Sequence, residues 1–204
     1  MHHEDFTGQY GKFYKNFHHK PWYKENVARM EALAKKEGFA KVSQLKLAVA
    51  KKIRAYVGGG GFMFAMCSAT DTYDIALAAD GHDICDHMFD GDPADPTAGS
   101  KLDFSKSFAF KDFKLKKNPF EYEFSTIDHN QGRNVNPKQD YFTLFDFSAK
   151  WDPIPTMLTQ NHTRTVKGFM GQTTAYNKEN IKSEVLVLGE NKPADEARLS
   201  LIHI

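Results

Sequence analysis

The chain has 204 residues, with 27 lysine and arginine residues against 26 aspartate and glutamate residues. This balance leaves no overall field that would attract nucleic acid or a membrane surface, so we expect neither as a partner. No apolar run approaches the roughly 20 residues that span a bilayer. The two cysteines, Cys67 and Cys85, form neither a disulfide framework nor a metal-site spacing, and we expect no metal and no cofactor. The compartment and the oligomeric state are left open.

The N-terminal third of the chain carries two helical patterns. The first predicts a helix over residues 21–36, because Pro21 suits the first turn of a helix. The second begins with Ser43 as N-cap, places apolar residues at four-residue spacing on one face, and ends at Gly58.

The most informative segment follows this second helix. Residues 58–61 are four consecutive glycines, and the apolar run of residues 62–66 leads directly to Cys67. Such a run is typical of a buried parallel strand, and the next residues predict a helix capped near Asp71. Ligands of open α/β sheets bind beyond the carboxyl ends of strands, so Cys67 is a candidate nucleophile at a tight strand-to-helix elbow. The alternative is a buried structural cysteine.

The second half of the chain changes in character. The alternating aspartates of residues 90–95 hint at calcium, but Lys101 stands where an EF-hand loop needs glutamate, which favours a solvated loop. Strands are predicted around residues 108–115 and over residues 141–147, and residues 185–188 are a candidate central strand. The order helix, strand, helix followed by these strands predicts an α/β protein.

The residues from Gly59 to Thr72 resemble the glycine-rich strand and turn of ThuA-like proteins, a branch of the class I glutamine amidotransferase-like fold. Nearly the whole chain is similar to a Bacteroidetes family that carries the label asparagine synthetase B. The segments with the clearest similarity are residues 2–8, 151–153, 160–164 and 189–192. The resemblance implies an incomplete flavodoxin-type parallel sheet with flanking helices and a β-rich excursion. It also implies a nucleophile at the position of Cys67.

These observations predict an enzyme that acts on a small polar metabolite or a sugar derivative through a strand-end pocket at Cys67. Ser68, Thr70 and Asp71 would shape the turn and contact the substrate. The alternative is a non-catalytic carbohydrate-binding module that uses the same pocket. We do not expect asparagine synthesis, because residue 2 is not the required cysteine and no pyrophosphate-binding loop occurs.

Further substrate contacts are predicted in two other segments. They are His2, His3, Glu4, Asp5, His162 and Arg164. The first segment is expected to line the site as a loop, because neighbouring strand residues point to opposite faces and cannot share one ion. In the second segment, Arg164 is suited to hold a carboxylate or a sugar hydroxyl.

Both ends of the chain are expected to be incomplete. Residues 199–204 resemble the translated transposase end sequence of sequencing libraries, so we expect the domain to be residues 1–198. A genuine apolar C-terminal strand is the alternative. The similar proteins have a sheet region before the segment that starts at His2, so Met1 is expected to be an internal methionine.

Overall fold

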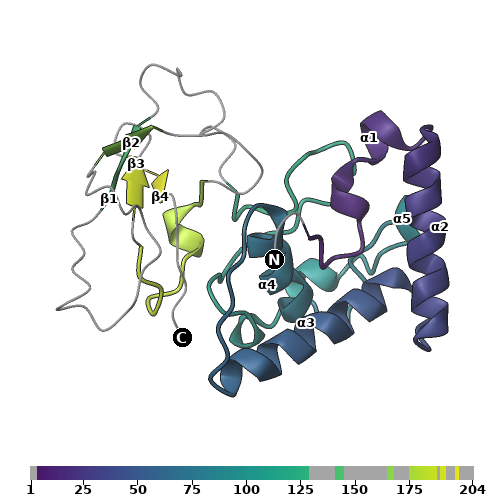
Figure 1. Cartoon of the computed structure of the whole chain (residues 1–204), viewed down its shortest axis with the longest axis horizontal. Helices are drawn as coiled ribbons and strands as arrows, with labels where there is room; N and C mark the ends of the chain where they lie inside the picture. The colour runs from purple at the N-terminus through teal and green to yellow at the C-terminus, as the bar shows by residue number, and fades with distance from the viewer. Residues whose placement is uncertain are drawn as a thin grey trace.

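The computed structural model describes residues 4–128, 141–144, 165–167, 175–187, 189–191 and 196–197. Helices come first along the chain, and the four strands follow after residue 140 (Figure 1). The α-helices are α1 (Tyr14–Phe17), α2 (Pro21–Lys36), α3 (Val42–Gly58), α4 (Ser68–Ala78) and α5 (His87–Asp90). Short 3-10 turns are η1 (Tyr10–Lys12), η2 (Ala98–Ser100), η3 (Phe104–Lys106) and η5 (Lys178–Asn180). The strands are β1 (Tyr141–Leu144), β2 (Thr165–Lys167), β3 (Gly189–Asn191) and β4 (Glu196–Ala197).

The strands form one antiparallel sheet in the order β2-β1-β3-β4. Phe142 of β1 lies opposite Val166 of β2, and Leu144 lies opposite Gly189 of β3. No parallel pair occurs among the described residues. The predicted α/β fold with a flavodoxin-type parallel sheet is therefore wrong for this part of the chain, which is mainly helical.

Residues 62–66 were the basis of that prediction, and they belong to none of the four strands. Their side chains do alternate as in a strand: Phe62 is 66% exposed, whereas Met63 and Ala65 pack against the helical core. A short apolar run specifies an extended local backbone, but it does not specify which segment will pair with it. The nucleophile elbow, which needs a strand of a parallel sheet before the turn, is wrong for the same reason.

The other predicted strands agree only in part. Residues 141–144 of the predicted strand over residues 141–147 form β1, and the remainder lies outside the described residues. In the predicted central strand over residues 185–188, residues 185–187 belong to no strand, and Leu188 lies outside the described residues. Residues 108–115 contribute two isolated bridges rather than a strand.

The three predicted helices are present, but two of them start earlier than expected. The third was predicted to be capped near Asp71, whereas Cys67 is the N-cap of α4 and Asp71 lies inside the helix. α2 has the predicted bounds, with Pro21 in its first turn. α3 begins at Val42, one residue before the expected cap Ser43, because the Gln44 side-chain oxygen accepts hydrogen bonds from the main-chain N–H groups of Ala40 and Lys41. No helix among the described residues has the length and apolar character that crossing a membrane requires.

α4 is the centre of the helical part, and it packs against α3 and η3 (Figure 1). One of its sides joins Ile75 and Ala78 to a core that contains Phe110 and Phe113. The opposite side joins Tyr73 and its neighbours to a second core formed with α3. Each fully buried large apolar side chain contributes roughly 1.5–3 kcal/mol to folding, so α4 supplies much of the packing energy.

Asp74 is the main polar residue inside this core. Its carboxylate accepts hydrogen bonds from the main-chain N–H groups of Phe108, Ala109 and Phe110 at 2.7–2.9 Å. Burial raises the pKa of Asp74 to about 6, although these three donors act in the opposite direction. Asp74 therefore ties the segment after η3 to α4 at a position from which water is excluded.

We expect Asp74→Asn to destabilise the fold by about 1–3 kcal/mol, because the amide group turns a donor toward main-chain donors. The native pKa lies above the unfolded value of about 3.9. The stabilisation from this carboxyl group is therefore complete below about pH 4 and is lost as the pH rises through about 6. Urea unfolding from pH 4 to 7 should show the difference between wild type and variant becoming smaller as the pH rises. A difference that stays constant across this range would contradict the assignment.

Candidate functional site

Cys67 is the N-cap of α4 and is half-buried. Its backbone has φ 57° and ψ −139°, which lies outside both the right-handed and the left-handed helical regions. Such a conformation in a residue other than glycine costs about 1–3 kcal/mol and persists only where the surroundings impose it. The Thr70 hydroxyl contributes to this constraint by donating to the Cys67 carbonyl oxygen at 2.7 Å. Tyr176 in turn donates its hydroxyl hydrogen to Thr70 Oγ1 at 3.4 Å.

The N-terminal segment docks on the first turn of α4. The Ser68 hydroxyl donates to the main-chain oxygen of Glu4 at 3.2 Å, and Thr72 Oγ1 lies at the same distance from that oxygen. The Phe6 N–H group donates to Thr72 Oγ1 at 3.3 Å. The Glu4 carboxylate forms an ion pair with Lys46 of α3. The predicted residues Glu4 and Ser68 therefore do lie together, and Ser68 directly follows Cys67 in the sequence.

Two predicted substrate-binding carboxylates are buried. Asp71 is fully buried and accepts from the Thr72 N–H group at 2.9 Å. Asp5 is 7% exposed and accepts from the main-chain N–H groups of Thr7 at 2.8 Å and Gly11 at 3.3 Å. Asp5 thus holds the N-terminal loop in shape through bonds that it makes inside the protein.

The remaining predicted site residues, His2, His3, His162 and Arg164, lie outside the described residues. The structure therefore places Glu4, Asp5, Ser68, Thr70 and Asp71 at or near the start of α4. It gives no position for the histidine that would serve Cys67 as a base. Thr72 and Tyr176 were not among the predicted site residues. Thr72 ends the segment that resembles ThuA-like proteins but was given no role, and Tyr176 stands in no motif.

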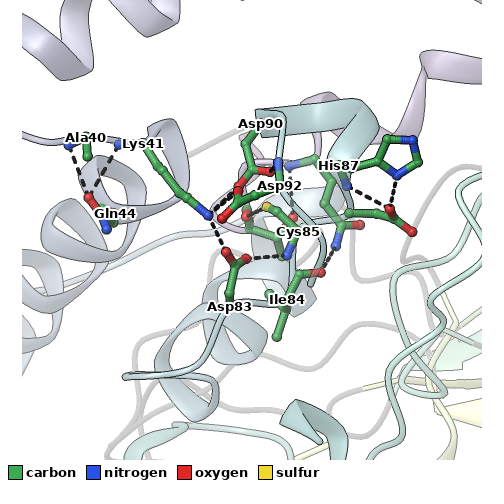
Figure 2. A network of polar contacts seen from close by, with 12 residues as sticks. Ala40, Lys41, Gln44, Asp83, Ile84, Cys85, His87, Asp90 and Asp92 are labelled. Atoms are coloured by element: carbon green, nitrogen blue, oxygen red, sulfur yellow. Dashed lines mark hydrogen bonds and ion pairs between the residues drawn. The ribbon is translucent and has the colours of Figure 1, made fainter. Parts of the chain in front are cut away.

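A second polar cluster was not predicted. Lys41, just before α3, forms ion pairs with Asp90 at the end of α5 and with Asp83 and Asp92 in the loops on either side of it. Figure 2 shows these carboxylates converging on the Lys41 ammonium group. Partial burial lowers the pKa of Lys41, but the hydrogen bonds to the carboxylates outweigh this effect and raise it. The Asp90 side chain is only 8% exposed, so this part of the predicted solvated loop is in fact buried.

Cys85 lies beside this cluster (Figure 2) and is fully buried. Its thiol donates to the Thr7 carbonyl oxygen at 2.9 Å, and burial raises the pKa of Cys85 well above its usual range. Asp83, Cys85 and Asp90 present possible metal ligands within 4.8 Å of one another. However, the Lys41 ammonium already binds both carboxylates, and an ion would have to displace it.

Two cavities adjoin this cluster. One of about 390 Å³ lies between the start of α3 and the end of α4, and another of about 250 Å³ reaches Phe89 and Phe124. Thr7 and Ile84 line both cavities and separate them. Cys67 lines neither, so the pocket predicted at this cysteine is not one of these two.

Comparisons with models of protein families, with curated proteins and with solved structures give no match for this chain. The resemblance to ThuA-like proteins therefore stays a prediction. The function has to be argued from the residues themselves.

We expect Lys41→Met to lower the free energy of unfolding by about 1–3 kcal/mol, because it leaves the buried Asp90 carboxylate without its counter-ion. Lys52→Met on the exposed face of α3 is the matched control and should have little effect. Thermal unfolding should show part of the stability restored when Asp90→Asn is added to Lys41→Met. If Lys41→Met and Lys52→Met were equally stable, the ion pairs of Lys41 would not contribute to the stability of the fold.

Proposed function

We propose that the protein acts on a small polar metabolite or a sugar derivative through the thiol of Cys67. The observation that carries this proposal is the backbone conformation of Cys67, a strained residue at the start of a buried helix. Strained backbone conformations of this kind are common at functional sites, where a side chain has to be held in one orientation.

The surroundings of Cys67 fit thiol chemistry in two respects. The N-terminal end of a helix stabilises negative charge, and Cys67 directly precedes α4, so the helix favours the reactive thiolate over the thiol. The buried Asp71 carboxyl group in the first turn works against this effect. The residue is also partly exposed, which a reaction with a dissolved substrate requires.

A non-catalytic module that binds a small molecule is the second candidate. Ser68, Thr70 and Asp5 all use their side chains to bind the protein itself, which speaks for structural and against catalytic roles of these groups. Under this alternative Cys67 shapes the turn, and its thiol has no chemical role.

Alkylation by iodoacetamide separates the two candidates. We expect Cys67 in the folded protein to label at least ~10 times faster than Cys85, since Cys85 is fully buried and its pKa is raised. Mass spectrometry of the digested protein gives both rates, and Cys67→Ser confirms which peptide carries the label. If Cys67 labels only after unfolding, it is a structural residue and the enzymatic proposal fails.

The strain itself can be measured with two substitutions. Cys67→Gly should be more stable than Cys67→Ala by about 1 kcal/mol, because only glycine tolerates φ 57° without a steric penalty. Both variants remove the thiol, so the comparison isolates the backbone. Urea unfolding midpoints that favour the alanine variant would show that the conformation of Cys67 is not strained.

A further inference from the structure

We infer that the cavity between the start of α3 and the end of α4 binds a small organic cation, namely a primary amine with a short apolar chain. This site is separate from the one proposed at Cys67. α4 has 11 residues, so its two ends lie about 16 Å apart, and Cys67 precedes the opposite end.

The size and the floor of the cavity suit a small ligand. Its volume of about 390 Å³ falls within the range typical of small-molecule sites. Phe6, Leu47, Ala76 and Ala79 contribute an apolar floor, and three of them are at most 5% exposed. A short alkyl chain would be buried against this floor, with a gain of roughly 0.8 kcal/mol for each buried CH₂ group.

The charges at the rim select a cation. Asp80 and Asp83 line the cavity where α4 ends, and the last carbonyl groups of a helix carry partial negative charge. Two separate groups of ion pairs reach this rim, through Asp80 and through Lys41 and Asp83. In the first, Lys51 and Lys106 balance Asp80 and Asp103. In the second, Lys41 faces Asp83, Asp90 and Asp92, which leaves a net charge of −2.

The cavity offers few positively charged groups that could bind an anion. Among the described residues, Lys41 is the one lysine or arginine that lines this cavity, and its ammonium group is already paired with three aspartates. The carboxylates retain acceptor capacity, because each has about four lone-pair sites. Asp80, for example, binds Lys51 at 2.7 Å through one oxygen and Lys106 at 3.4 Å through the other. An ammonium group can therefore add its own hydrogen bonds without breaking these pairs.

Three probes with the same four-carbon alkyl chain test the inference: butylammonium, butanol and pentanoate. They share the apolar chain and differ in head-group charge, and their binding is followed by NMR titration of the ¹⁵N-labelled full chain. We expect butylammonium to shift the amide signals of Ser43, Gly81 and His82 at concentrations where pentanoate does not. Butanol should bind more weakly than butylammonium, because it keeps the apolar contact and lacks the charge.

Two matched pairs of variants locate the site. Leu47→Trp fills the cavity and should abolish the shifts, whereas Val49→Trp, on an exposed position of the same helix, should leave them unchanged. Asp80→Asn should weaken butylammonium binding ~3- to 10-fold, and Asp112→Asn, an exposed aspartate that does not line the cavity, should not.

Three results would overturn the inference. The first is equal binding of butylammonium and pentanoate, which would show that charge does not select the ligand. The second is binding that survives Leu47→Trp, which would place the probe elsewhere. The third is the absence of any shift with a folded wild-type protein. None of these results bears on Cys67, so the alkylation experiment judges the proposed function independently.

Discussion

Ten of the eleven residues of α4 are buried, so this helix needs partners on all of its faces. Two separate apolar cores meet it from opposite sides, and the N-terminal segment closes over its first turn. The arrangement of the described part of the chain follows from this burial. A helix buried all round cannot carry charged groups without partners, and Asp74 meets this requirement with three main-chain donors.

The burial of α4 also explains where its polar groups can be reached by solvent or a ligand. Its sides are used for packing, so only its two ends can meet solvent. At the N-terminal end, the chain reaches the helix through the strained turn at Cys67. At the C-terminal end, Asp80 and Asp83 face a cavity whose floor is the apolar side of the same helix. The two ends carry opposite partial charges, which suits them to ligands of opposite sign.

The Lys41 cluster shows how loops without regular structure are held in place. The segment from Asp83 to Asp92 contains one short helix and several turns, and local hydrogen bonds alone would give it little stability. One ammonium group joins three of its carboxylates to α3. The same ammonium group occupies the position that would otherwise suit a cation among Asp83, Cys85 and Asp90, which couples loop structure to local charge.

Local sequence determined the helices well. Pro21 marks the start of α2, and the apolar spacing from Leu45 onward marks α3, because both signals act within a few turns of the chain. It also indicated a helix after the apolar run, although its cap was expected near Asp71 and lies at Cys67. The apolar run of residues 62–66 was visible too, but it was interpreted as a buried strand of a parallel sheet. Phe62 is in fact 66% exposed, and the described residues form no such sheet.

Tertiary structure decided the features that join distant parts of the chain. Lys41 and Asp83 are 42 positions apart, and Asp74 meets its donors 34–36 positions away, so no local pattern could have linked them. Strand pairing depends on the same long-range choice, because an extended apolar segment can pair with many others. Sequence therefore determined which segments are helical, whereas the fold decided how the extended segments pair, which charges meet, which carboxylates are buried and where a cavity remains.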